Sequence, residues 1–214
     1  MKQQGRFGLF QRLTAALALL VLAGCAGIPG EPSVDGKVGI QSKRLDVVQR
    51  SGFACCNLHY SGELISDANY AQLPFIPAGT PVKIMNTDGA RVRIDVNGKS
   101  MQFGVENGRE SGTIEQWLNR IVVAEDPRLK MAAFLPAVRE AIKAGKLMRG
   151  MTREQVIMAV GHPQTNDNLR LGGAYWRYWW SSYDSYYVYW SKNATLSKID
   201  GQAETVNSMT YKGK

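Results

Sequence analysis

Apolar and polar residues alternate along residues 81–105, and this period of two is typical of β-strands with one buried face. The alternating apolar positions are Val82, Ile84, Val92, Ile94, Val96, Met101, Phe103 and Val105. Asp88-Gly89 and Asn97-Gly98 separate three strands, and Asn-Gly is a strong signal for a two-residue hairpin turn. With a further strand expected at residues 53–60, the pattern predicts a small antiparallel β-barrel within residues 38–108.

The spacing of apolar residues becomes helical in the middle of the chain, where two start signals follow one another. Thr113–Gln116 is a capping box, in which the Thr and Gln side chains each bond to the backbone of the other residue. Asp126-Pro127 is a second start signal, because Asp caps a helix and Pro suits its first position. We expect Pro136 to kink or divide this second helix and Gly145 to end it.

A further helix and an aromatic sheet are predicted near the C-terminus. The helix starts at a second capping box, Thr152–Gln155, and stops at Gly161. Four of the five Trp and six of the nine Tyr residues lie between residues 175 and 190. This segment predicts two aromatic strands joined at Ser182–Ser185, with a third short strand at residues 196–199.

The N-terminal residues have the order of an export signal, with basic residues, then an apolar run, then small residues. Lys2, Arg6 and Arg12 precede an apolar run at residues 13–22. This run is too short for a helix that crosses a membrane, which needs about 20 residues. We therefore predict a signal peptide over residues 1–24.

The segment Leu22–Cys25 reads Leu-Ala-Gly-Cys, which resembles the lipobox of bacterial lipoproteins. The resemblance implies that the chain is cut before Cys25 and that the Cys25 thiol carries a lipid anchor in a membrane. Ala26, in place of an Asp, implies attachment to the outer membrane on its periplasmic side. Residues 25–37, rich in Gly and Pro, are predicted to form a flexible tether. The alternative is an ordinary signal peptide with a chance cysteine.

The charge of the chain changes this picture little. The net charge is +8, and residues 1–24 carry three basic and no acidic residues, so the predicted mature chain has a charge of +5. A charge of this size serves solubility. The sequence has no run of four or more Lys or Arg residues, so it gives no sign of nucleic-acid binding.

Two further cysteines, Cys55 and Cys56, are neighbours in the sequence. Export would place them in the oxidising periplasm, where unpaired thiols are unusual. One hypothesis is a vicinal disulfide that acts as a redox switch or a rigid turn. The other is one buried and one half-exposed thiol, and we favour it because neighbouring side chains on a strand point to opposite faces.

Three motifs of the C-terminal part occur in a fixed order. They are Gly150-Met151-Thr152 at a helix start, Gly161-His162-Pro163 at its stop, and Trp176-Arg177-Tyr178 on a strand. This order resembles the SmpA/OmlA family, the BamE-like outer-membrane lipoproteins, over residues 138–201. The resemblance implies two helices with a three-stranded antiparallel sheet. It also implies a non-enzymatic accessory of the complex that folds β-barrels into the outer membrane. The same design resembles secreted inhibitors of β-lactamase.

The aromatic strands are expected to have two different faces. The family's Trp-x-Tyr pattern implies that Trp176 and Tyr178 pack on the helices. The opposite face is the predicted binding surface, because Tyr, Trp and Arg are enriched at binding hot spots. Its residues are Tyr175, Arg177, Trp179, Tyr187 and Tyr189. The alternative is that the N-terminal barrel covers this second face.

Patterns of catalytic and metal-binding residues are missing from the sequence. His59 and His162 are the only histidines, and we expect His162 to be a surface turn residue. A nucleophile–base pair of Cys56 and His59 is disfavoured, because residues three apart on a strand face opposite sides. The scattered acids expected to be solvated loop charges are Glu63, Asp67, Glu106 and Glu110. We therefore expect no enzyme activity, no cofactor and no metal.

These patterns together predict an α+β protein. The expected parts are a signal peptide (1–24), a tether (25–37), a small antiparallel barrel (38–108), a helical connector (109–137), a BamE-like module (138–201) and a loose tail (202–214). Asn57-Leu58 with residues 76–82 resembles the opening of bacterial Src-homology-3-like domains. The expected function is that of an outer-membrane lipoprotein that binds another envelope protein, in outer-membrane protein assembly or envelope integrity. The alternatives are a peptidoglycan- or small-ligand-binding module built on the barrel, and an inhibitor of a periplasmic enzyme.

Overall fold

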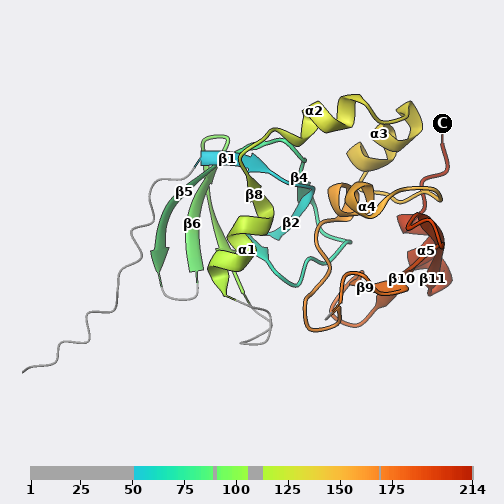
Figure 1. Ribbon diagram of the computed structural model, residues 1–214. Helices are drawn as coiled ribbons and strands as arrows, with labels where there is room; N and C mark the ends of the chain where they lie inside the picture. Colours follow the sequence, from blue (N-terminus) through green and yellow to red (C-terminus); the bar gives the residue numbers. More distant parts are fainter. Residues whose placement is uncertain (1–50, 89–90, 106–112, 169, 214) are drawn as a thin grey trace, which may run out of the picture. The chain divides into compact units, whose positions relative to one another are not determined.

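The structure is a computed structural model that describes residues 51–88, 91–105, 113–168 and 170–213 (Figure 1). The predicted signal peptide, Cys25 and the tether lie outside the described residues, as do Glu106 and Glu110. Within the described part, no helix is long and apolar enough to cross a membrane.

The N-terminal half forms a curled sheet in the order β4-β2-β3-β7-β6-β5-β1-β8. Its strands are β1 (Ser51–Ala54), β2 (Leu58–Ser61), β3 (Leu64–Ser66), β4 (Phe75–Ile76), β5 (Pro81–Asp88), β6 (Arg91–Val96), β7 (Lys99–Gly104) and β8 (Val122–Val123). The prediction of an antiparallel barrel is wrong in one respect, because β3 pairs with β7 in parallel. The chain reverses direction in the hairpin between β2 and β3. As a result, β3 runs in the same direction as β7 and pairs with it in parallel.

The predicted meander of β5, β6 and β7 is confirmed. Val92 and Ile94 are fully buried while Arg91 and Arg93 are exposed, as a period of two requires. The turn between β6 and β7 has Asn97 at φ 53° and Gly98 at φ 86°, the pair of positive φ angles that a tight hairpin needs. Sequence alternation and turn chemistry are therefore sufficient to specify this part of the sheet.

The single strand predicted at residues 53–60 is divided into β1 and β2 by a bend at Cys55-Cys56. The chain changes neighbours across this bend, because β1 pairs with β5 and β8, whereas β2 pairs with β3 and β4. At the bend, the Cys55 amide donates to the Ile121 carbonyl at 2.9 Å and the Asn57 amide to the Met158 carbonyl at 3.0 Å. Bonds to helical residues thus replace the sheet ladder.

The helix start signals are confirmed. The helices are α1 (Ile114–Ile121), α2 (Pro127–Ala132), α3 (Pro136–Lys143), α4 (Arg153–Val160) and α5 (Ala203–Met209). Both capping boxes form, at Thr113 with Gln116 and at Thr152 with Gln155. Pro136 divides the second helix and begins α3, because proline suits the first helical position and disrupts an interior one.

The C-terminal sheet has the predicted three antiparallel strands, in the order β11-β10-β9. They are β9 (Tyr175–Trp179), β10 (Ser185–Trp190) and β11 (Leu196–Gly201). The loose tail predicted after Gly201 is wrong, because α5 occupies most of it. Met209 and Thr205 of α5 are buried, so the helix is held by packing, although Gln202 at its start makes no capping bond.

The described residues belong to one compact unit with two hydrophobic clusters. The first cluster lies inside the curled sheet and includes Trp117 of α1. The second joins α3 and α4 to one face of the C-terminal sheet and includes Ala78 from the N-terminal half. The fold class is therefore α+β, with the C-terminal sheet packed on helices by one of its faces.

Candidate functional site

One face of the C-terminal sheet is core. Trp176 and Tyr178 of β9 are 1% and 2% exposed, and Tyr186 and Val188 of β10 are fully buried. They pack in the same cluster as Val156, Ala159 and Val160 of α4. The expectation that Trp176 and Tyr178 pack on the helices is confirmed.

The opposite face carries the five residues predicted to bind a partner. We call this set the aromatic face: Tyr175, Arg177, Trp179, Tyr187 and Tyr189. Tyr175 is 51% exposed, and the other four are partly exposed. None of the five belongs to either hydrophobic cluster of the described residues. The alternative, in which the N-terminal sheet covers this face as core, therefore does not hold for the described part of the chain.

The side chains of the aromatic face support one another. The Tyr175 ring lies 5.8 Å from that of Tyr187 and 5.7 Å from that of Tyr189. The Arg177 guanidinium lies 4.1 Å from the centre of the Trp179 ring and 6.0 Å from that of Tyr187, within the range of cation–π contacts. The rings are thus ordered before any partner arrives, which lowers the entropy lost on binding.

Asp167 completes this arrangement from the loop before β9. Its carboxylate accepts a hydrogen bond of 2.6 Å from the Trp179 indole and lies 3.5 Å from the Arg177 guanidinium. Asp167 was not among the predicted residues, because it stands in a polar loop where the sequence alone does not distinguish one acid from another. Only the three-dimensional position of the loop reveals its role.

The free edge of β9 is closed by the rest of the fold. The Asn168 side chain accepts from the Arg177 amide at 2.8 Å and donates to the Arg177 carbonyl at 2.9 Å. Further along the edge, the Ala71 amide donates to the Trp179 carbonyl at 3.0 Å. An added strand would need these backbone groups. The aromatic face, rather than this edge, is therefore the part of β9 open to a partner.

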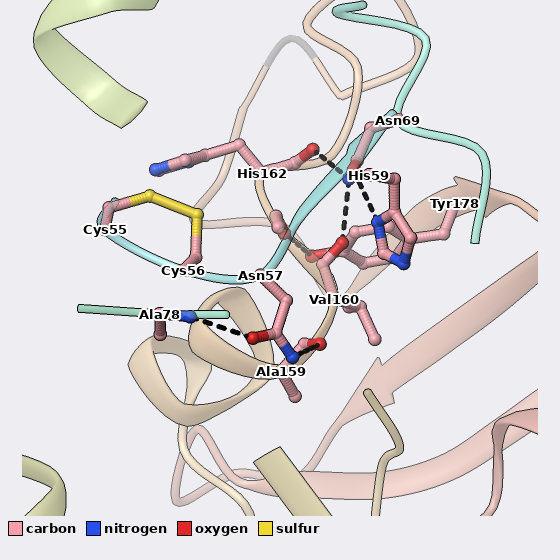
Figure 2. Close-up of a disulfide and its surroundings, with 11 residues drawn as sticks. Cys55, Cys56, Asn57, His59, Asn69, Ala78, Ala159, Val160, His162 and Tyr178 are labelled. Carbon is pink, nitrogen blue, oxygen red and sulfur yellow. Dashed lines mark hydrogen bonds between the residues drawn. A yellow bond between two sulfur atoms is a disulfide. The ribbon is translucent and has the colours of Figure 1, made fainter. Parts of the chain in front are cut away.

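Cys55 and Cys56 form a disulfide at the bend between β1 and β2 (Figure 2). The favoured hypothesis of two separate thiols is wrong, because its premise of a continuous strand fails at this bend. Cys56 is fully buried within the N-terminal cluster, while Cys55 is half-buried. Asn57 follows directly and donates from its side-chain amide to the carbonyls of Ile142 and Ala159 at 2.7 and 2.9 Å.

Neither histidine is a simple surface residue. His59 is buried on β2, and its Nδ1 shares a hydrogen bond of 2.9 Å with Asn69 Oδ1 (Figure 2). Burial lowers the His59 pKa, although the bond to Asn69 opposes this. His162, expected at a surface turn, is instead half-buried and lines a pocket together with Cys55. Burial, followed by the positive charge of Arg120, lowers the His162 pKa to about 4.

The remaining candidate residues do not gather into a catalytic or metal site. Cys56 is bound to Cys55 and is not available to pair with His59. Asp67, expected to be solvated, is buried at the end of the β2–β3 hairpin region, whereas Glu63 is exposed as expected. Among the described residues, no group of three or more His, Cys, Asp or Glu side chains is placed to hold a metal ion.

Comparison of the chain with protein-family models, with curated proteins and with solved structures finds no match.

Proposed function

We propose that the chain is a lipoprotein anchored at Cys25 in the outer membrane, whose BamE-like C-terminal part binds another envelope protein through the aromatic face. The observation that carries the proposal is the contrast between a buried face and an ordered, partly exposed face rich in Tyr, Trp and Arg on one sheet. Large rigid rings contribute much contact area at little entropic cost, and they dominate binding hot spots.

The charges of the aromatic face indicate the chemistry of the partner. Arg177 lies against Asp167, and Lys198 of β11 lies 2.9 Å from Asp200. These pairs leave the aromatic face with little net charge, so we expect electrostatic attraction to contribute little to the rate at which a partner binds. The hydroxyls of the three face tyrosines accept or donate no hydrogen bond among the described residues. We therefore expect the partner to be a protein surface of apolar side chains, with accompanying polar groups that can bond these hydroxyls.

The membrane part of the proposal rests on the Leu22–Cys25 segment and has its own test. Cells producing the wild-type chain or Cys25→Ser are grown with a clickable fatty-acid analogue. Label is expected on the wild-type protein and absent from the variant, which should also leave the membrane fraction. Label that persists on Cys25→Ser would overturn the anchor without bearing on the aromatic face.

The binding part is tested by photo-crosslinking in intact cells of the native bacterium. A photoreactive phenylalanine replaces Tyr175 or Tyr187 on the face, or Leu135, which is 73% exposed between α2 and α3. One membrane-embedded or membrane-anchored protein is expected to crosslink from the face positions and not from Leu135. Trp179→Ala should weaken the Tyr187 crosslink.

Three results would contradict the binding part. Equal crosslinking from Leu135 would show contact without a specific face. Co-sedimentation with purified peptidoglycan that survives Trp179→Ala would favour a cell-wall ligand bound elsewhere. A soluble periplasmic hydrolase as the crosslinked protein would indicate an inhibitor instead of an envelope scaffold.

A further inference from the structure

A pocket of about 640 Å³ opens beside the vicinal disulfide. Its lining includes Cys55, Arg120 of α1, Ile157 and Met158 of α4, and His162. The volume lies within the range typical of small-molecule sites. No part of the proposed function uses this pocket, which is lined by neither β9 nor β10.

We propose that Cys55 is a thiol-exchange site, at which a low-molecular-weight thiol entering this pocket forms a mixed disulfide. The pocket and the disulfide together form this site, which involves neither the aromatic face nor the anchor.

The two sulfurs differ in their access to the pocket. Cys55 lines it, whereas Cys56 is 0% exposed and packs inside the N-terminal cluster. An incoming thiolate can therefore reach Cys55 Sγ, and Cys56 Sγ is the leaving group. A bond forms between the thiol sulfur and Cys55 Sγ as the Cys55–Cys56 bond breaks. The electron pair passes to Cys56 Sγ, which takes up the proton that the thiol lost on ionisation.

The exchange is completed by a second molecule of the same thiol. Its sulfur attacks the thiol sulfur of the mixed disulfide, and Cys55 leaves as a thiolate that takes up a proton. The net change is the reduction of one protein disulfide to two thiols and the oxidation of two thiol molecules to their disulfide. The oxidising periplasm would favour the reverse direction at rest.

The charges that line the pocket favour a thiolate near Arg120. The carboxylates of Asp126 and Glu154 also line it, but each lies within an ion pair, at 2.5 Å from Arg128 and 2.9 Å from Lys130. Arg120 donates to the neutral Thr165 hydroxyl at 3.1 Å and stacks on Trp117, so its charge meets no acid among the described residues. Arg120 and Cys55 line the same pocket, and a cation near a thiol that enters it raises the fraction of that thiol present as thiolate. Glu125 is the lining charge that opposes it.

The backbone around the disulfide is held whether or not the ring is closed. The Cys55 amide bonds to Ile121, and the Asn57 amide and side chain bond to Met158, Ile142 and Ala159. Figure 2 shows the Asn57 side chain next to the disulfide, bonded to the Ala159 carbonyl and to the Ala78 amide. None of these bonds involves a sulfur atom, so we expect the fold to remain when the ring opens and the freed Cys55 side chain to move into the pocket that it lines.

The test treats the folded full-length protein with reduced glutathione, quenches it in acid and locates the adduct by peptide mass spectrometry. One glutathione per chain is expected on Cys55, with Cys56 free and Cys25 unmodified. Arg120→Gln should slow adduct formation about fivefold. Lys143→Gln, which removes an equal charge from α3 away from the pocket, is the matched control and should react at the wild-type rate.

Two variants that each lack one of the paired cysteines, and that both keep Cys25, test the same site if the reduced protein proves unstable. In Cys56→Ser the remaining Cys55 should react with a small maleimide in the folded protein, and in Cys55→Ser the remaining Cys56 should not. The inference is overturned by an adduct on Cys56, by a disulfide that glutathione opens only in denaturant, or by reduction that occurs only with a protein dithiol. An unchanged rate in Arg120→Gln would overturn the role of that residue.

Discussion

The two faces of the C-terminal sheet are built from the same kinds of residue, but one face is buried and the other is partly exposed. The buried face presents Trp176, Tyr178 and Tyr186 to α4, while the aromatic face presents Tyr175 and Trp179, among others, away from the core. Composition therefore does not separate them. Position along the strand does, because neighbouring residues point to opposite sides and α4 covers one side only.

The difference also shows what stabilises rings in each setting. On the buried face the Tyr178 and Tyr186 rings stack at 5.5 Å with an interplanar angle of 13°, surrounded by apolar side chains. On the aromatic face, Arg177 and Asp167 hold the Trp179 ring by charge and hydrogen bonding. Polar support is what allows a row of rings to remain ordered without a core around it.

Removing one tryptophan from each face of β9 should give the largest difference between the two faces. Trp176→Ala empties a fully enclosed site and should lower the free energy of unfolding by about 3–5 kcal/mol. Trp179→Ala removes a partly exposed ring and its bond to Asp167, and should lower it by about 1 kcal/mol. Urea denaturation followed by circular dichroism measures both.

Trp179→Ala, the variant with the smaller expected loss of stability, should have the more direct effect on partner binding. Trp179→Ala should weaken the crosslink at Tyr187 in a protein that remains folded, whereas Trp176→Ala acts through unfolding. Similar losses of stability in the two variants would mean that both faces are core, and the binding surface would then lie elsewhere.

The end of α4, the helix that covers the buried face, is closely packed. Gly161 ends it with φ 79°, and a Cβ placed there would lie 2.7 Å from Asn69 Nδ2. Asn69 cannot easily turn aside, because its side chain donates to the Val160 and His162 carbonyls at 2.8 and 3.0 Å. Gly161→Ala should therefore lower the free energy of unfolding by about 2–4 kcal/mol.

Thr152→Ala, at the other end of α4, is the matched variant for that prediction. It removes the capping bond to the Gln155 amide and should cost about 1 kcal/mol. Differential scanning calorimetry of both variants gives the ranking. An equal or larger loss in Thr152→Ala would mean that the close approach of Asn69 to Gly161 is not tight in solution.

Local signals in the sequence were enough to place most of the helices and strands. Both capping boxes, the division at Pro136 and the hairpin at Asn97-Gly98 depend on residues that lie within a few positions of one another. The strand period divided the aromatic residues into two faces, and the resemblance to the SmpA/OmlA family implied which of the two faces packs on the helices. Such features are kept in the folded chain because the tertiary contacts are compatible with these local preferences.

Features made by distant residues could not be predicted in this way. The strand β8 forms because Val122 and Val123 pair with β1, which lies about 70 residues earlier in the chain. In the sequence, these two apolar residues fit the end of a helix equally well. The bend at Cys55 depends on carbonyls of α1 and α4. The helix α5 lacks a capping side chain and depends on burial of Met209. Asp167 is significant only through its place beside Trp179.

Alkaline pH offers a smaller test of the same contrast. Burial raises the pKa of both Tyr178 and Tyr186 above the usual value near 10. Above that pH the unfolded chain loses protons that the folded chain keeps, so stability falls as pH rises. For each such tyrosine the slope rises with pH and approaches about 1.4 kcal/mol per pH unit near pH 11, where the unfolded tyrosine is mostly ionised. Urea midpoints measured from pH 9 to 11 should lose part of this slope in Tyr178→Phe and again in Tyr186→Phe; an unchanged slope in both would show that water reaches the buried face.

The smallest expected effect is the difference in stability between Tyr178→Phe and Tyr186→Phe, whose rings stack on one another. The Tyr178 hydroxyl donates to the Gly161 carbonyl at 3.2 Å, whereas the buried Tyr186 hydroxyl has no hydrogen-bond partner among the described residues. At neutral pH, Tyr178→Phe should therefore lower the free energy of unfolding by about 1 kcal/mol, because it leaves a buried carbonyl unsatisfied. Tyr186→Phe removes a hydroxyl that was desolvated without compensation, and should raise that free energy by a similar or smaller amount. Both changes delete one oxygen from a fully enclosed ring, so cavity effects cancel in the comparison. Chemical denaturation resolves a difference of this size. A loss of stability in Tyr186→Phe equal to that in Tyr178→Phe would reveal an ordered water bonded to the Tyr186 hydroxyl, and the buried face would then be less dry than the contrast with the aromatic face requires.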